Sequence, residues 1–260
     1  MPRKPGLCAS SPPAFRKPCL ERLEDRCLLS GDVVVELPIP PGFGHPVDIA
    51  AGPDGNLWFT ETVPGLDSAT SSYVGRITPA GQVTEFSIPA EGTPFGSGGG
   101  GLQITAGPDG NLWFTESSSY SKVAEISPSG GITVYHHAGI SEPEGIVAGS
   151  DGALWFTNDE GDSIGRITTK GDVHIYRHAG IKRPWGIAGG PDGAIWFTNP
   201  VRNTIGRITT EGVVTIYADP RIHGPQGIVA GPDGALWFAN HYGRSIGRIT
   251  TRGSVRILTG

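Results

Sequence analysis

Three carboxylates in the middle of this sequence have the residue types and spacing of a small reactive site. Glu142 and Glu144 flank a proline, and Asp159 follows a Trp-Phe pair further along. Carboxylate oxygens are the ligands that hard cations such as Mg²⁺ and Ca²⁺ prefer, so the three side chains predict a cation site if they converge. The alternative is an ordinary solvated acidic rim, because charged side chains are mostly exposed in proteins.

The stretch that carries these carboxylates, Glu142 to Arg177, is one copy of a unit that the chain repeats. Each copy has a tight turn, a strand such as ALWFT, a strand such as IGRIT and a last strand such as VHIYR. A tryptophan marks each copy, at spacings of 55, 42, 41 and 41 residues: Trp58, Trp113, Trp155, Trp196 and Trp237. A period of about 41 residues with four short strands predicts one blade of a β-propeller.

The strands themselves are predicted by short runs of Ile, Val, Trp, Phe, Thr and Tyr that end at Gly, Pro, Asn or Asp. In the fourth repeat these runs are Ile187–Gly189, Ile195–Thr198, Thr204–Thr209 and Val213–Tyr217. Turns of the GPDG type separate them, with Pro where φ is preset and Gly where φ is positive. We therefore expect an all-β fold of four-stranded antiparallel blades.

Five complete repeats are predicted between His45 and Leu258, with one spare N-terminal strand at Val33–Leu37. The long first spacing reflects two insertions, at Thr62–Ser71 and Gly92–Gly101. Because the fifth repeat already has its own last strand, two arrangements stay open. Either a five-bladed ring closes and leaves the spare strand outside, or the ring is incomplete, which we favour. An incomplete ring exposes apolar blade surface and favours a protein partner at the open blade edge.

The composition limits the classes of partner. The net charge of −5 gives no basic stripe, so nucleic acid is not expected as a partner. The sequence has no run of 18 apolar residues, so no transmembrane helix is expected. All three cysteines (Cys8, Cys19 and Cys27) precede the repeats, so a disulfide framework is not what holds the fold.

The first residues differ in composition from the rest, and we predict an N-terminal segment 1–31 followed by a propeller domain 32–260. The stretch LERLEDRCLLS (Leu20–Ser30) resembles the N-terminal sorting signal of many exported planctomycete proteins. That resemblance implies export to the cell envelope or to the outside. The alternative is a frayed amphipathic tail.

Repetition separates scaffold from site, because a residue that recurs in every blade serves the fold. The arginines of IGRIT and the aspartates of the turns recur, so we expect structural roles for them. The residue after the proline that opens each inner strand changes instead, and it should lie at one mouth of the central channel. We therefore predict a small-molecule or peptide ligand at this mouth, in contact with four residues: Trp185, Gln226, His241 and His45.

The pattern of PxGI, GPDGxLWFTE, IGRIT and GxITEY covers almost all of His45–Leu258 and resembles the virginiamycin B lyase (streptogramin B lyase) family. The resemblance implies a propeller that opens the ester of a cyclic depsipeptide by elimination. It also implies a divalent metal, usually Mg²⁺, and a histidine base. The working residues of the family are an acid-Pro-His entry, an acid after Trp-Phe, and a Pro-His in the preceding blade.

Transferred to this sequence, the resemblance implies that Glu142 and Asp159 are metal ligands. Glu144 stands in the place of the histidine base, and Leu102 stands where the preceding blade would have its histidine. Crowding by the other two carboxylates should raise the pKa of Glu144, which would let it act as a base. Three hypotheses follow: a metal-assisted lyase, a non-catalytic exported propeller that binds a ligand at the channel mouth, and a protein-interaction module.

Overall fold

The computed structural model describes residues 44–62, 73–88, 103–117 and 121–258, all of which belong to the compact unit Ile39–Gly260. The predicted segment 1–31, the strand Val33–Leu37, Leu102 and nearly all of both insertions lie outside the described residues. In the described part, no helix is long and apolar enough to cross a membrane.

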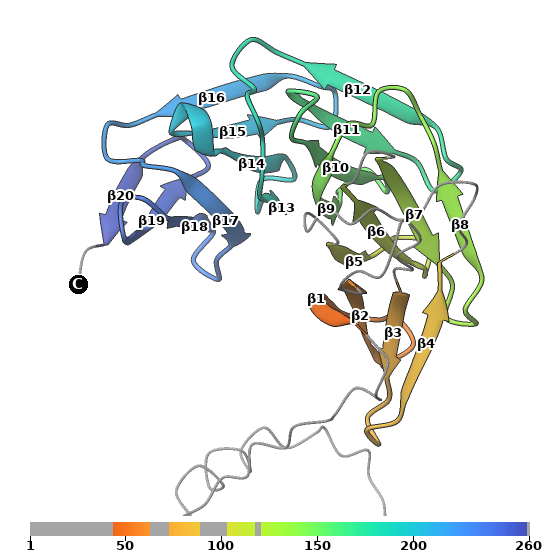
Figure 1. Ribbon diagram of the computed structural model, residues 1–260. Helices are drawn as coiled ribbons and strands as arrows, with labels where there is room; N and C mark the ends of the chain where they lie inside the picture. Colours follow the sequence, from red (N-terminus) through yellow and green to blue (C-terminus); the bar gives the residue numbers. More distant parts are fainter. Residues whose placement is uncertain (1–43, 63–72, 89–102, 118–120, 259–260) are drawn as a thin grey trace, which may run out of the picture. The chain divides into compact units, whose positions relative to one another are not determined.

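The described residues form five sheets, each with four antiparallel strands in chain order (Figure 1). Their bounds are β1 His45–Ala51, β2 Leu57–Thr62, β3 Tyr73–Ile77 and β4 Val83–Ser87; β5 Ile104–Ala106, β6 Leu112–Glu116, β7 Lys122–Ile126 and β8 Ile132–Tyr135; β9 Pro143–Ala148, β10 Leu154–Asn158, β11 Ser163–Ile167 and β12 Val173–Arg177; β13 Ile187–Gly189, β14 Ile195–Asn199, β15 Thr204–Ile208 and β16 Val214–Ala218; β17 Pro225–Ala230, β18 Ala235–Asn240, β19 Ser245–Thr250 and β20 Val255–Leu258. One short 3-10 helix, η1 (Pro200–Arg202), lies between β14 and β15. The predicted five four-stranded blades are confirmed.

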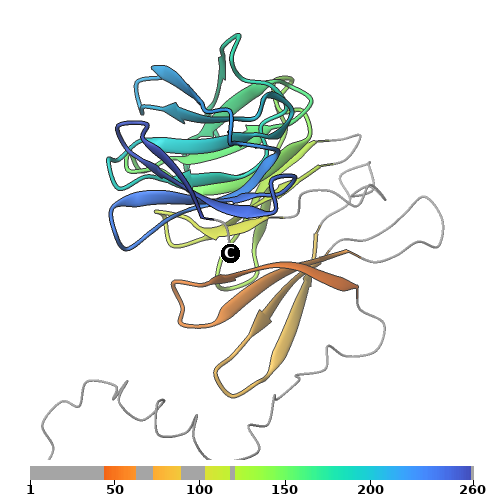
Figure 2. The same cartoon turned by 90° about the vertical axis from the view of Figure 1, so that its left-hand side faces the viewer.

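The sheets follow one another so that the first strand of each contacts the first strand of the next. These first strands, β1, β5, β9, β13 and β17, lie on the inner side in Figure 1, and the fourth strands lie on the outer side. The first and fifth sheets lie apart in both views, and no described strand of one pairs with a strand of the other (Figures 1 and 2).

The hydrophobic core lies in the seams between successive sheets. In the seam between the third and fourth sheets, Trp155 and Ile164 pack against Ile195, Phe197 and Ile208. Equivalent clusters fill the other three seams. Burying one aromatic side chain of about 150–250 Å² contributes several kcal/mol at about 25 cal/mol per Å², so the seams are the main source of stability.

The aspartate of the preceding turn binds each of the five marker tryptophans, and four of these tryptophans are fully buried in a seam. The Trp155 indole N–H donates a hydrogen bond to Asp151 Oδ1 at 3.1 Å, and the other repeats have the same bond at 3.0–3.1 Å. Asp151 Oδ2 also accepts a bond of 2.7 Å from Arg166 Nε. A Cβ at Gly149 would collide with both Trp155 and Asp151, so only glycine fits there. The recurring Asp and Arg therefore serve the fold, as expected.

Replacing Asp151 with alanine should lower the free energy of unfolding by about 1–3 kcal/mol, because the buried Trp155 N–H loses its acceptor. Denaturant unfolding of the purified protein measures this change. Asp172→Ala, at an exposed turn position, is the matched control and should change stability by less than about 0.5 kcal/mol. Equal effects of the two substitutions would contradict this role for Asp151.

Candidate functional site

The backbone of the predicted site is held by a threonine that recurs in the second strand. Thr157 Oγ1 accepts a bond from the Gly145 N–H at 2.9 Å and donates to the Trp185 carbonyl in the next sheet at 2.7 Å. Equivalent threonine hydroxyls donate to the carbonyls of Glu144 and Gln226 at 2.6 and 2.8 Å. Glu144, Trp185 and Gln226 therefore occupy the same position in three successive sheets, and their side chains have no part in this bonding.

Glu144 lies in β9 and is only 7% exposed. Burial raises the pKa of its carboxyl to about 7, and the negative charges of Asp159 and Glu142 add to the effect. The Ser117 hydroxyl and the Arg183 guanidinium act in the opposite direction but do not cancel it. The predicted crowding of Glu144 by the other two carboxylates is therefore present in the structure.

Asp159 is buried and is held by an arginine from the next sheet. Arg183 Nε lies 3.2 and 3.0 Å from the two carboxylate oxygens of Asp159, and a second guanidinium nitrogen also contacts Oδ2. This bond raises the pKa of Arg183 further above its usual range. The guanidinium itself is half exposed, so a positive charge faces solvent directly beside the carboxylates.

Glu142 lies immediately before β9 in a left-handed conformation, with φ of 44°. Its carbonyl accepts a 2.9 Å bond from the Asp159 N–H, which ties the two residues together. Burial raises the pKa of the Glu142 carboxyl, as do the charges of Glu160 and Asp159. Arg183 occupies the same repeat position one sheet later, with the same φ of 44°. This left-handed entry position thus carries an acidic residue, Glu142, in the third sheet and a basic residue, Arg183, in the fourth.

The three carboxylates do not form a metal cluster in their present arrangement. Among the described residues, no group of three His, Cys, Asp or Glu side chains is placed to hold a metal ion. Asp159 is engaged by Arg183, so it can bind a cation only after the guanidinium releases it. In this arrangement Asp159 is therefore not available as a ligand for Mg²⁺.

The four predicted ligand-contacting residues are spread over three sheets. Trp185 is 41% exposed, and Gln226 is half-buried at the equivalent position of the fifth sheet. His241 is exposed and lies edge-on to the Tyr242 ring, with centroids 5.0 Å apart. His45 is exposed at the start of β1. No interaction found among the described residues joins either histidine to the carboxylates.

Arg183, the cation that the structure places on Asp159, was not predicted from the sequence. Its partner Asp159 lies 24 positions earlier in a different sheet. The available signal was the entry position itself, where Glu142 in one repeat becomes Arg183 in the next. A basic residue at a repeat position that carries an acidic residue in the preceding repeat indicates a local charge pair.

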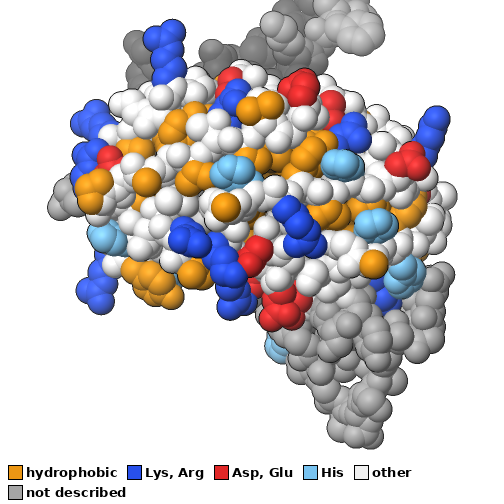
Figure 3. All heavy atoms as spheres, turned by 90° about the horizontal axis from the view of Figure 1, so that it is seen from above, with side chains coloured by type: hydrophobic (Ala, Val, Ile, Leu, Met, Phe, Trp, Pro, Cys, Tyr) orange, Lys and Arg blue, Asp and Glu red, His pale blue; other side chains and the backbone are white. Residues whose placement is uncertain are grey.

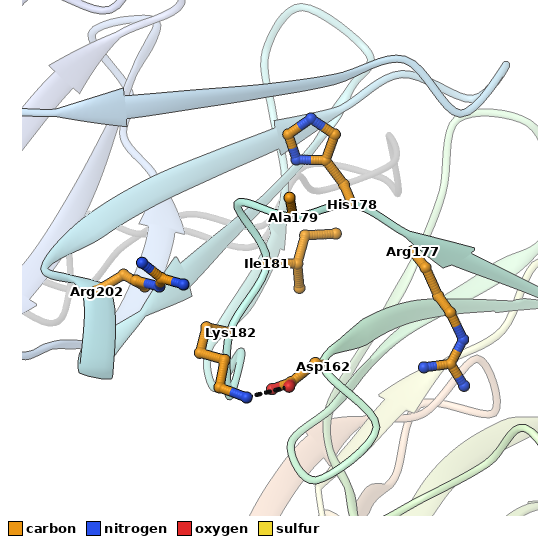
Figure 4. Close-up of a pocket in the computed structure, with 7 residues that line it drawn as sticks. All are labelled: Asp162, Arg177, His178, Ala179, Ile181, Lys182 and Arg202. Carbon is orange, nitrogen blue, oxygen red and sulfur yellow. Dashed lines mark hydrogen bonds and ion pairs between the residues drawn. The ribbon is translucent and has the colours of Figure 1, made fainter.

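A separate pocket of about 480 Å³ lies between the loops of the third and fourth sheets (Figure 4). Lys182 is paired with Asp162 there, and Arg177 points away from the other charged groups. On the face shown in Figure 3, basic, acidic, histidine and apolar side chains are interspersed. No broad patch of one charge is visible on this face.

Comparison with known proteins identifies the family of this chain. A family model described as the virginiamycin B lyase family matches residues 25–135 and 95–259. The chain belongs to the virginiamycin B lyase family. No curated protein matches it.

Solved structures of the same family share the fold. A selenomethionine-substituted virginiamycin B lyase from Staphylococcus aureus has a TM-score of 0.73 and 34% identity, over 83% of this chain and 70% of the other. A streptogramin B lyase has a TM-score of 0.73 and 32% identity, over 86% and 72%. A catalytically inactive variant of the Staphylococcus aureus lyase with quinupristin has a TM-score of 0.66 and 29% identity, over 84% and 85%. This chain is thus a virginiamycin B lyase-like propeller with a glutamate at the entry of its third sheet.

The raised pKa of Glu144 predicts a pH-dependent cost in stability. Folding raises this pKa from 4.5 to about 7, so the folded state favours the protonated carboxyl. The contribution of Glu144 to the free energy of unfolding is therefore highest below about pH 4.5 and falls as the pH rises through about 7. Glu144→Gln should therefore unfold with a free energy about 1–2 kcal/mol higher than wild type at pH 8, after allowance for solvent screening. At pH 4.5 the two proteins should differ little.

Denaturant titrations at both pH values make this comparison, with Glu160→Gln as the control because Glu160 is exposed. A difference between wild type and Glu144→Gln that does not change with pH would show that Glu144 has an ordinary pKa.

Proposed function

We propose that this protein is a C–O lyase that opens the ester of a cyclic depsipeptide, with Glu144 as the base. The observation that carries the proposal is a buried carboxyl with a pKa of about 7 at the position where the family resemblance places the base. A base with a pKa near the working pH is both ionised in a large fraction of molecules and strong enough to accept a proton.

In this reaction Glu144 removes the proton from the carbon next to the amide carbonyl of the esterified residue. The electron pair forms a carbon–carbon double bond, and the bond from the β-carbon to the ester oxygen breaks. The leaving group departs as a carboxylate, and no water is consumed. Negative charge develops on the carbonyl oxygen, so a nearby cation would stabilise the transition state.

Arg183 is the cation that the described residues supply for this charge. Its guanidinium is fixed by Asp159, and the Arg183 side chain is half exposed. Trp185, two residues later, offers an exposed aromatic face against which an apolar or aromatic ring of the ligand can pack. A large cyclic peptide with aromatic side chains suits such a surface.

The test is incubation of the purified protein with quinupristin, followed by liquid chromatography with tandem mass spectrometry. We expect a linear product of unchanged mass that contains the new double bond, because elimination is an isomerisation. Hydrolysis would add the mass of water and would contradict the elimination mechanism. Glu144→Gln should reduce turnover at least about 100-fold, since general base catalysis contributes about 10²–10⁴-fold. Glu160→Gln should retain activity.

The binding of Mg²⁺ by Glu142 and Asp159 stays a proposal with its own test. Arg183→Ala frees the Asp159 carboxylate, so calorimetry should show that this variant binds Mg²⁺ more tightly than wild type. Arg202→Ala, a substitution in η1, is the control and should bind Mg²⁺ as wild type does. Equal affinity in wild type and Arg183→Ala would contradict a metal site at Asp159.

A second candidate function is ligand binding without catalysis, and one observation favours it. Asp159 is already neutralised by Arg183, so the mouth has the paired charges and the exposed aromatic ring of a recognition surface. In this case quinupristin would bind and quench the fluorescence of Trp185 but would be recovered unchanged. We also propose export to the cell envelope or to the outside, because Leu20–Ser30 resembles a sorting signal.

A further inference from the structure

The pocket between the loops of the third and fourth sheets is lined by three cations that the neighbouring repeats do not share. Arg177 ends β12, Lys182 lies in the loop before β13, and Arg202 lies in η1 (Figure 4). Neither neighbouring repeat has a lysine or an arginine at any equivalent position: His136, Ser141 and Gly161 in the preceding one, and Ala218, His223 and Gly243 in the following one. Residues that serve the scaffold recur, so three cations confined to one place indicate a binding site.

Positive charge and hydrogen-bond donors prevail in this lining. Asp162 is the one acidic group among the described residues that line the pocket, so three positive charges stand against one negative charge. The chain as a whole carries a net charge of −5, so the local excess is opposite in sign. His178 Nδ1 accepts a 3.0 Å bond from the Gly180 N–H, which leaves Nε2 of the neutral ring as a donor.

Asp162 is the internal counter-ion of Lys182, and its main-chain role does not need a charge. One carboxylate oxygen is paired with Lys182 Nζ, and Oδ1 accepts a bond from the Arg183 N–H at 2.9 Å. In the next repeat Asn203 Oδ1 accepts the equivalent main-chain bond from the Gly224 N–H at 2.7 Å. An amide therefore suffices for the backbone, and the charge of Asp162 acts on Lys182.

The three cations differ in how free they are to bind a ligand. Arg177 Nη1 donates to the Gly161 carbonyl at 2.7 Å, and its side chain points away from Lys182 (Figure 4). Arg202 is exposed, and none of the ion pairs found among the described residues includes it. Lys182 and Arg202 are therefore the groups for direct contact, while Arg177 adds positive charge nearby.

We propose that this pocket binds a small organic molecule through a dianionic phosphate group, with Lys182 and Arg202 as the contacts. Lysine and arginine form strong charge-assisted hydrogen bonds with phosphate oxygens. The excess of two positive charges in the lining balances a dianion.

The size of the pocket favours a phosphate that is attached to an organic group. Its volume of about 480 Å³ lies within the range of about 300–1,000 Å³ that is typical of small-molecule sites. Ala179 and the buried Ile181 give the pocket an apolar part, against which an organic group can pack. The site is independent of the proposed lyase reaction, because Glu144 and Arg183 do not line it.

The experiment is isothermal titration calorimetry of the full chain with phenyl phosphate, at low salt and pH 8. A phosphate ester with a second pKa of about 6 is a dianion at this pH. Lys182→Gln and Arg202→Gln should each weaken binding about fivefold, the effect of one unit charge at about 4 Å in water. Lys170→Gln removes the same charge at the opposite end of β11 and β12, so it should bind as wild type does. An equal loss in Lys170→Gln would overturn the proposal.

Asp162→Asn is the variant that should gain affinity. It removes the counter-ion of Lys182 and keeps an acceptor for the Arg183 N–H, as Asn203 does in the next repeat. We expect phenyl phosphate to bind about fivefold more tightly than to wild type. Circular dichroism checks that the variant is folded, and unchanged or weaker binding to the folded variant would contradict the proposal. If it does not fold, Lys182→Gln and Arg202→Gln still decide.

Two further ligands identify the chemistry that the pocket recognises. Phenyl sulfate has a similar shape and one negative charge fewer, so it should bind about fivefold more weakly than phenyl phosphate. Inorganic phosphate separates the two sources of the dianion: weaker binding supports a phosphate ester, and equal binding supports free phosphate as the ligand. Wild type that binds neither phosphate compound, or that binds phenyl sulfate as tightly as phenyl phosphate, would overturn the proposal.

Discussion

The hydrogen bond from each marker tryptophan to its turn aspartate is the constraint on which the fold depends. It satisfies the one polar group of a large aromatic ring, so the ring can be buried completely in a seam. Without an acceptor, that N–H would cost about 1–3 kcal/mol. In the third, fourth and fifth sheets an arginine of the third strand in turn fixes the aspartate, as Arg207 fixes Asp192. The Trp–Asp hydrogen bond, the turn that carries the aspartate and the seam that buries the tryptophan therefore recur together. This is why the repeat is easy to recognise in the sequence.

Because the scaffold is held by these recurring groups, the entry positions are free to differ. The threonine hydroxyls of the second strands bond only to main-chain atoms at the entries. Glu144, Trp185 and Gln226 can thus replace one another without a change in backbone bonding. Differences between repeats are therefore tolerated at positions whose side chains take no part in the main-chain bonding.

This division explains how much could be predicted from the sequence. The strands of the fourth repeat were predicted to within one residue at each end, because β-branched and aromatic runs alternate with Gly and Pro turns. The crowding of Glu144 was predictable because its two neighbours belong to the same repeat. The pairing of Asp159 with Arg183 was not, since it crosses a seam and depends on how two sheets are placed.

The charges of the site are consistent with one another in a way that links Glu144 to Arg183. A carboxylate can serve as a base near neutral pH only if its pKa is raised, and here burial and two neighbouring carboxylates raise it. A divalent cation held directly beside Glu144 would lower that pKa strongly and make the carboxylate a poor base. A single guanidinium bound to Asp159 lowers it only slightly. A glutamate in the place of a histidine base and an arginine on the neighbouring acid are therefore two parts of one electrostatic arrangement.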